Sequence, residues 1–229
     1  MAVFIIGMVG GIFADQIFWP YFVERPLFYQ YRLERPPIYI TERKEIKIQE
    51  NVALTEAIEK GEKVIFGVKT KTQKGKILEG SGLILTNDGL ALTFADLVPQ
   101  GGSFSFFFEE GVLVGEVLKR DLKENLALIK FEKKNLPTAP FSNLEKIKLG
   151  QRVFLVGVIF EKAKIKKTVN EGIIKSFNED QIETNIFENE KLRGSTLFDI
   201  EGNILGINEI KDNKIITIPV SKIKSFAGL

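Results

Sequence analysis

The feature that most constrains the fold is a series of short β-prone runs, separated by turn residues, from residue 62 onward. Runs such as VIFGVKTK, SFSFFF and RVFLVGVIF are rich in β-branched and aromatic residues, and turn signals such as Asn87-Asp88-Gly89 lie between runs. Strands at this spacing, without repeated long amphipathic helices, favour an all-β sandwich or barrel over an α/β fold. A segment with two prolines, residues 132–148, divides the strands into two similar groups. We therefore expect two barrels joined by a linker.

Composition excludes several classes of function. The 32 basic and 30 acidic residues are spread along the chain and leave a net charge of +2, without the basic stripe that neutralises phosphates. Nucleic acid is therefore not an expected partner. The chain contains no cysteine and no histidine, which excludes disulfides, thiolate chemistry and the usual zinc sites. No acidic loop has EF-hand spacing, so we expect no metal and no cofactor.

The N-terminal segment is the most apolar part of the chain. We predict a transmembrane anchor over residues 1–23, because the run from Ala2 to Val23 has about the 20 residues that a membrane-spanning helix needs. Asp15 and Gln16 interrupt this run, and an N-terminal core helix is the alternative. Arginines follow the run and none precedes it, which by the positive-inside rule would leave the body of the protein in the cytoplasm.

The remaining boundaries follow from composition. Residues 24–49 contain three prolines among charged and aromatic residues and are predicted to be a linker. A short helix is expected from Asn51 to Lys60, with Asn51 as N-cap and Gly61 ending it. The first β-barrel is assigned to residues 50–131, the inter-barrel linker to 132–148 and the second β-barrel to 149–229.

Three blocks carry a resemblance to a known family. They are GSGLIL, NDG and LTFADLV within residues 80–98, RDLKENLALIK at residues 120–130, and GSTLFDIEGNILGIN at residues 194–208. In this order they resemble the motifs of HtrA-like, trypsin-fold serine peptidases, and the resemblance covers roughly residues 50–226. It implies a trypsin-like double six-stranded β-barrel. No PDZ module is expected after Leu229.

Matched residue by residue, the resemblance places substitutions at every catalytic position. The family's histidine falls on Asp96, its aspartate on Asn125, its serine on Arg193 and its oxyanion-hole glycine on Lys191. A guanidinium is neither a nucleophile nor a source of a removable proton, and without histidine the usual general base is absent. We therefore expect no catalytic residues and a catalytically inactive serine protease homologue, a pseudoprotease.

Two hypotheses concern the substituted centre. Asp96 and Arg193 could form an ion pair across the barrel interface, supported by Asn125, or both charged side chains could simply face solvent. A displaced nucleophile is the second hypothesis, in which Ser195 attacks with Lys191 as its base. The alternative to that role is that Ser195 is an ordinary polar turn residue.

Peptide binding could survive the loss of catalysis. Trypsin-like barrels hold a polypeptide as an added strand, and the matching edge is Asn208, Glu209 and Ile210. The preferred interpretation is a membrane-tethered pseudoprotease that binds polypeptides or partner proteins. The alternatives are a residual peptidase and a structural scaffold of a membrane-associated assembly. The resemblance also implies barrels outside the cytoplasm, in conflict with the positive-inside rule, and a homo-oligomer.

Overall fold

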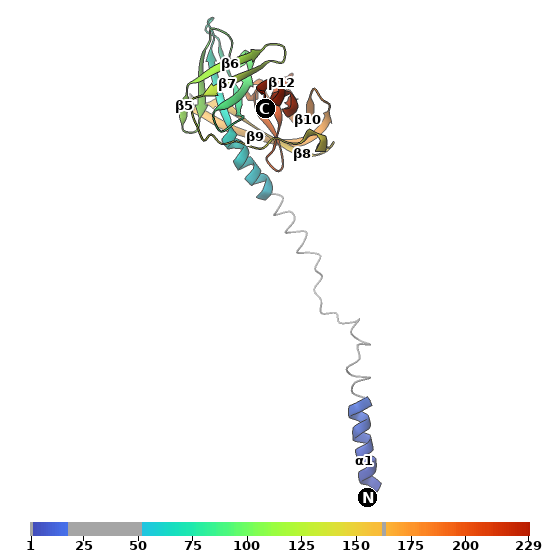
Figure 1. Cartoon of the computed structure of the whole chain (residues 1–229). Helices are drawn as coiled ribbons and strands as arrows, with labels where there is room; N and C mark the ends of the chain where they lie inside the picture. The colour runs from blue at the N-terminus through green and yellow to red at the C-terminus, as the bar shows by residue number, and fades with distance from the viewer. Residues whose placement is uncertain (1, 18–51, 162–163) are drawn as a thin grey trace. The chain divides into compact units, whose positions relative to one another are not determined.

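The structure, a computed structural model, describes residues 2–17, 52–161 and 164–229. The chain divides into two compact units, Met1–Ile48 and Gln49–Leu229 (Figure 1). The predicted linker, residues 24–49, lies outside the described residues. The two units are described separately below.

The first unit contains an apolar helix. Helix α1, Ala2–Phe13, consists only of apolar residues and glycines, as the sequence predicts for this segment. Its 12 residues rise about 18 Å, whereas the hydrocarbon core of a bilayer is about 30 Å thick. Within the described ranges no helix combines the length and apolarity needed to cross a membrane, so the expected spanning helix is not found there. Residues 18–23 of the predicted anchor lie outside the described residues.

The second unit opens with a helix over residues 52–61, followed by the 3-10 turn η3, Glu62–Val64. The predicted N-cap Asn51 lies outside the described residues. Seven strands then form one antiparallel sheet in the order β5-β4-β1-β2-β3-β7-β6. These strands are β1 Ile65–Lys71, β2 Ile77–Ile84, β3 Leu90–Phe94, β4 Ser103–Phe108, β5 Gly111–Leu113, β6 Gly115–Asp121 and β7 Leu126–Phe131.

This first sheet corrects the expectation of two closed six-stranded barrels, because it is an open half-barrel whose edges are β5 and β6. Only Val114, which is 91% exposed, separates these two strands. A hairpin connection needs about two residues, so β5 and β6 cannot fold back on each other. The three residues of β5 also offer little backbone for closure.

Phenylalanines fill the interior of the first sheet. Phe66 and Phe131 are fully buried, and their rings meet edge to face at 5.3 Å. Phe106 and Phe108 each pack on both of these rings, as the period-two pattern of SFSFFF predicts for one face of a strand. Such a cluster combines large apolar burial with favourable ring geometry.

The second sheet is a closed barrel in the order β10-β13-β12-β11-β8-β9. Its strands are β8 Arg152–Glu161, β9 Lys164–Phe177, β10 Ile182–Phe187, β11 Thr196–Asp199, β12 Ile204–Lys211 and β13 Lys214–Pro219. Aliphatic side chains such as Leu155, Leu197 and Leu205 fill it and are fully buried. Helix α3, Val220–Ala227, packs on β12 and β13 and ends at Gly228, whose positive φ of 76° suits a helix C-terminus.

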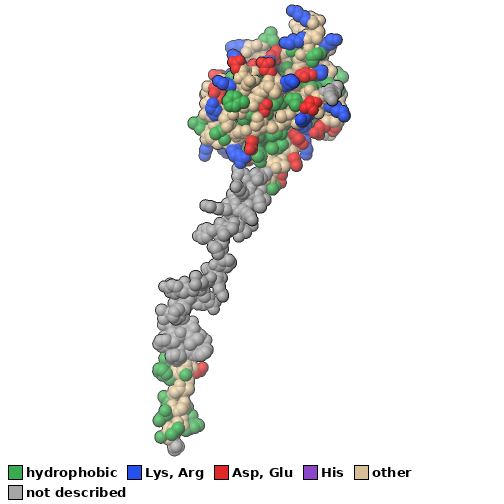
Figure 2. Space-filling model, turned by 180° about the vertical axis from the view of Figure 1, so that it is seen from behind, with side chains coloured by type: hydrophobic (Ala, Val, Ile, Leu, Met, Phe, Trp, Pro, Cys, Tyr) green, Lys and Arg blue, Asp and Glu red, His purple; other side chains and the backbone are tan. Residues whose placement is uncertain are grey.

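The half-barrel and the barrel lie side by side within the second unit (Figure 1). Phe107, whose neighbours Phe106 and Phe108 face the interior of the first sheet, meets Phe160 of β8 at 5.2 Å. Buried Ser81 of β2 accepts a hydrogen bond at its Oγ from the N–H of Val158, at 2.8 Å. On the face seen in Figure 2, basic and acidic side chains of this unit are interspersed. The joint between the two sheets is therefore apolar and hydrogen-bonded, and it positions the site described next.

Candidate functional site

Asp96 and Arg193 meet at the joint between the half-barrel and the barrel. Asp96 lies in the 3-10 turn η4, Ala95–Leu97, which follows β3, and Arg193 ends the 3-10 turn η6, Glu190–Leu192, which precedes β11. One guanidinium nitrogen of Arg193 lies 2.5 Å from Oδ2 of Asp96. The ion pair that the sequence offered as one of two hypotheses is therefore present, and it joins the two sheets.

Arg193 has two further partners that sequence reasoning missed. Its other terminal nitrogen lies 3.2 Å from Oε1 of Glu209 on β12, and its guanidinium lies 5.1 Å from the ring centre of Phe94. The Arg193 side chain is 25% exposed, against 45% for Asp96 and 38% for Glu209. Both carboxylates are thus partly withdrawn from water. We call Asp96, Arg193 and Glu209 the ionic clamp.

Asn125 supports the clamp, as the ion-pair hypothesis expects. Its Oδ1 accepts a hydrogen bond from the N–H of Asp96 at 3.1 Å, and its carbonyl accepts one from the N–H of Ala95 at 2.9 Å. Asn125 holds a left-handed φ of 55°, a conformation that asparagine adopts more readily than most residues. The turn before it is fixed by Asp121, where hydrogen bonds from the backbone N–H groups of Glu124 and Lys123 lower the pKa of the carboxyl.

The backbone amides of Lys191, which the resemblance matches to the oxyanion-hole glycine, and of the nearby residues Arg193 and Gly194 all donate hydrogen bonds inside the protein. The N–H of Lys191 donates to Oδ1 of Asn189 at 3.0 Å, and the N–H of Arg193 donates to the carbonyl of Glu190 at 3.1 Å. The N–H of Gly194 donates to the carbonyl of Asn208 at 3.0 Å. An oxyanion hole needs amide donors aimed at the reacting oxygen. The turn η6 directs these amides elsewhere.

Gly194 lets the chain pass close to β2 directly after Arg193. Its φ is +80°, and a Cβ at this position would lie 2.2 Å from the carbonyl oxygen of Ser81. The N–H of Ser81 in turn donates to the carbonyl of Arg193 at 2.8 Å. Glycine is needed here both for the left-handed backbone and for the close approach. This contact fixes the backbone from which the Arg193 side chain extends.

Ser195, the candidate displaced nucleophile, is fully buried in a polar chain of three side chains. Its Oγ accepts a hydrogen bond from Nδ2 of Asn208 at 3.0 Å, and Oδ1 of Asn208 accepts one from Oγ1 of Thr217 at 2.6 Å. The proposed base, Lys191, is exposed and has no hydrogen bond to Ser195. The structure therefore does not bring the sequence-derived Ser195–Lys191 pair together.

The predicted peptide-binding edge is only partly accessible. The N–H of Asn208 donates to the carbonyl of Ser195 at 2.7 Å, so the backbone of Asn208 is already paired on the side facing away from β13. Glu209 lies opposite Ile216 of β13 in the sheet, and its carboxylate forms an ion pair with Arg193 in the clamp. Backbone direction alternates along a strand, so the N–H and C=O of Ile210 point the same way as those of Asn208. Among the described residues, β11 pairs with β12 no further than Ile207.

A cleft of about 580 Å³ opens beside the clamp. The start of β2, the turn η6 and the end of β12 form its walls, so both sheets contribute. Its lining residues are Lys76, Ile77, Leu78, Glu79, Leu97, Glu190, Lys191, Arg193, Glu209, Ile210 and Lys211. The cleft therefore contains two of the four substituted family positions, Lys191 and Arg193, and two of the three predicted peptide-binding residues.

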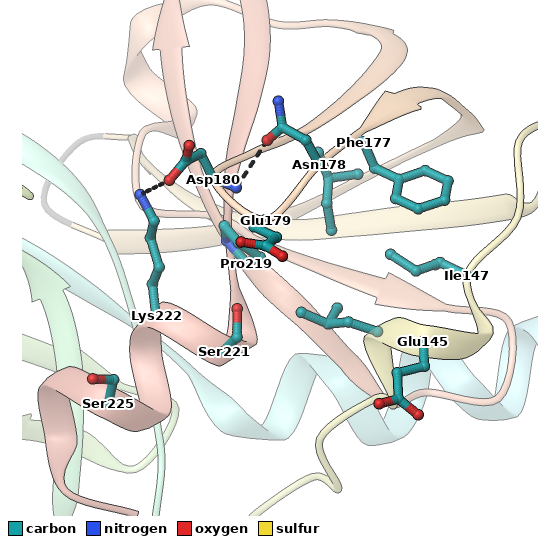
Figure 3. A pocket seen from close by; sticks show the side chains of 12 residues that line it. Glu145, Ile147, Phe177, Asn178, Glu179, Asp180, Pro219, Ser221, Lys222 and Ser225 are labelled. Carbon is teal, nitrogen blue, oxygen red and sulfur yellow. Dashed lines mark hydrogen bonds and ion pairs between the residues drawn. The ribbon is translucent and has the colours of Figure 1, made fainter.

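A second cavity, of about 630 Å³, lies near helix α3 (Figure 3). Apolar side chains such as Ile147 and Phe177 line one side, and on the other side Lys222 lies 2.9 Å from Asp180. This contact raises the pKa of Lys222 and lowers the pKa of Asp180. None of the four positions that the resemblance matches to catalytic residues lines this cavity, so it is separate from the clamp.

A comparison with known families matches the part of the chain that contains this site. The family described as "Trypsin-like peptidase domain" matches residues 80–207, a span that includes η4, Asn125, η6 and the start of β12. The chain belongs to this family. The match covers the block in which Asp96, Asn125 and Arg193 occupy the three catalytic positions of the resemblance.

Its relatives identify the branch of the family as HtrA-like. The chain is 30% identical over 138 residues to a probable periplasmic serine endoprotease DegP-like of Halomonas elongata, covering 56% of this chain and 28% of the relative. It is 29% identical over 163 residues to serine protease HTRA1 of Xenopus laevis, covering 64% of this chain and 35% of the relative. The chain thus spans about a third or less of the length of these relatives.

A solved structure shares the fold. The crystal structure of the serine endoprotease from Yersinia pestis superposes with a TM-score of 0.67 at 20% identity. The superposition covers 75% of this chain and 64% of that one. At this level of identity, the similarity establishes the trypsin-like fold.

No metal site accompanies the clamp within the described ranges, where no group of three or more potential metal-ligating side chains is found. The clamp itself offers two carboxylates, Asp96 and Glu209, but both face the guanidinium of Arg193. A cation there would have to displace Arg193 first.

Proposed function

We propose that this chain is a catalytically inactive, membrane-tethered HtrA-like homologue that binds polypeptide segments in the cleft beside the ionic clamp. The observation that carries the proposal is the engagement of both former oxyanion amides. The N–H groups of Lys191 and Arg193 donate to Asn189 and Glu190. Loss of a single oxyanion donor costs about 10²–10³ in rate, and here both amides already donate hydrogen bonds within the turn η6.

The side chains at the former triad positions support the same proposal. Arg193 replaces the nucleophile, and its positive charge is held between two carboxylates. The chain has no histidine to act as general base. Ser195 is fully buried, and its Oγ already accepts a hydrogen bond from Nδ2 of Asn208.

Peptide binding needs none of these groups. A polypeptide added to a strand edge is held mainly by main-chain hydrogen bonds. Beside the cleft, the backbone groups of Ile210 point away from β13. Ile77–Glu79 of β2 pair with β1 on one side, and β3 pairs only with Leu83 and Ile84 of β2, so the other side of Ile77–Glu79 is not paired with β3. Two strand edges therefore border the same cleft.

Tethering and location rest on the N-terminal unit and on the relatives. Helix α1 contains no polar side chain, a composition suited to contact with lipid, and the apolar run continues to Val23 in the sequence. The DegP-like relatives are named as periplasmic proteins. We place the second unit outside the cytoplasm on this ground, against the arginines that follow the apolar run.

The test is hydrolysis of a denatured, fluorogenically labelled protein by the purified full chain in non-ionic detergent. Wild type, Arg193→Ala and Ser195→Ala are compared, and binding of the same substrate is measured by fluorescence anisotropy. We expect saturable binding without turnover in all three. Turnover by the wild type that disappears in Ser195→Ala would refute inactivity and make Ser195 the nucleophile. Absence of any saturable binding would refute the polypeptide-binding role.

A further inference from the structure

The cleft beside the clamp has an excess of unpaired positive charge. Lys76, Lys191 and Lys211 line it and are exposed. None of the three ammonium groups forms an ion pair with a carboxylate anywhere in residues 52–161 and 164–229. These lysines come from three separate segments, namely the start of β2, the turn η6 and the end of β12. The positive charge therefore surrounds the cleft instead of following one strand.

The other charged groups of the cleft already form ion pairs, with one exception. Glu79 is paired with Lys69 at 2.7 Å, and Glu209 is paired with Arg193. Arg193 is in turn satisfied by its two carboxylates. Glu190 is the one lining carboxylate without an ion pair among the described residues. The clamp carries one net negative charge, because Arg193 is shared by two carboxylates. Three exposed, unpaired ammonium groups still outweigh this charge and that of Glu190, so the cleft keeps a net positive charge that attracts anions.

The same cleft presents apolar side chains between the lysines. Ile77 is 47% exposed, and Leu78, Leu97 and Ile210 also line the cavity. A small phosphate or sulfate ion would leave these side chains unused. An extended polypeptide uses both features, because successive side chains of a strand point in opposite directions and can alternate between apolar contact and charge.

We infer that the polypeptide bound here is an acidic one, an extended segment in which Asp or Glu residues alternate with apolar residues. This inference rests on the proposed function and adds the chemical class of the ligand. Lys76, Lys191 and Lys211 are its specificity-determining residues. The ionic clamp remains closed in the complex, because its guanidinium already has carboxylate partners.

The experiment measures the affinity of the full chain, in non-ionic detergent, for three fluorescent decapeptides. They share one apolar and serine framework and differ at three positions, which are Glu, Gln or Lys. We expect the Glu peptide to bind about tenfold more tightly than the Gln peptide at about 50 mM salt, and the ratio to shrink as salt screens the charges. The triple variant Lys76→Gln, Lys191→Gln, Lys211→Gln should lose this preference.

A matched triple variant controls for overall charge. Lys134→Gln, Lys146→Gln, Lys175→Gln removes three exposed lysines that lie outside the cleft and should keep the preference. Equal binding of the Glu, Gln and Lys peptides would overturn the inference and leave the proposed function standing. A preference that survives in the cleft variant would also overturn it. Failure of all three peptides to bind would count against the proposed function itself.

Discussion

Removing the ionic clamp should destabilise the joint between the two sheets by a measurable amount. The change is Arg193→Met, which keeps much of the apolar stem and removes the charge. Ion pairs between exposed groups contribute about 0.2–1 kcal/mol each, and both clamp pairs belong at the upper end because Arg193 is only 25% exposed. The contact with Phe94 adds about 0.5–1 kcal/mol. Nε of Arg193 is buried without a partner in the described part of the chain, which offsets about 1 kcal/mol of this gain.

The expected net loss is therefore about 1–2 kcal/mol in the free energy of unfolding. In a domain of this size each 1 kcal/mol lowers the Tm by about 2–4 °C. A double-mutant cycle isolates the pair itself, using Asp96→Asn, Arg193→Met and the double variant in urea unfolding followed by circular dichroism. The coupling energy between Asp96 and Arg193 should be about 0.5–1 kcal/mol and should fall with added salt.

A matched cycle on a more exposed ion pair is the control. Glu161 and Lys166 lie 3.3 Å apart, and both side chains are about 60% exposed. The cycle Glu161→Gln and Lys166→Met should give a coupling energy close to zero. If the clamp cycle is equally close to zero, Asp96 and Arg193 act as independent solvent-exposed charges and the clamp contributes nothing to the joint.

Three further predictions follow from the site. Reinstalling the triad by Asp96→His, Asn125→Asp and Arg193→Ser should not restore hydrolysis of a fluorogenic peptide, because the amides of η6 stay engaged; turnover well above the wild-type background would contradict this. Gly194→Ala should cost about 2–5 kcal/mol in urea unfolding, from left-handed strain and the clash with Ser81, and a loss below about 1 kcal/mol would mean that the close approach relaxes freely. The lowered pKa of Asp121 implies stability that is present above its ordinary value of 3.8 and is lost as pH falls below it; Asp121→Asn should therefore flatten the pH dependence of the unfolding midpoint below pH 3.8, and an unchanged pH dependence there would argue against this carboxylate as its source.

Much of the fold follows from local sequence signals. The run VIFGVKTK contains β1, and RVFLVGVIF lies within β8, because β-branched and aromatic residues at this density favour strands. Gly89, in the predicted turn Asn87-Asp88-Gly89, has a φ of +102°, which explains why glycine stands there. Local conformational preference and side-chain periodicity therefore carry the strand assignments.

Closure of the first sheet could not be predicted in the same way. The sequence around Val114 has strand propensity on both sides, but the one-residue connection between β5 and β6 and the shortness of β5 work against pairing of these two strands. Motif matching gave Asp96, Asn125 and Arg193 as the positions to examine, but it assigned Glu209 to peptide binding. Glu209 and Arg193 are 16 residues apart in the sequence. Whether their side chains meet depends on how β12 is placed against η6.

The charged side chains of the clamp and the backbone amides of Lys191 and Arg193 all have partners within the protein. Arg193 could not be accommodated in a water-poor joint without counter-charges, and Asp96 from η4 and Glu209 from β12 supply them. The turn η6 satisfies its own amides, so no oxyanion is needed to complete its hydrogen bonding. In an active centre of this fold, backbone N–H donors point at the position where a negative charge forms only during the reaction. Here the corresponding groups are paired in the resting protein, and the unpaired charge lies instead on the lysines around the cleft, where a polypeptide can reach it.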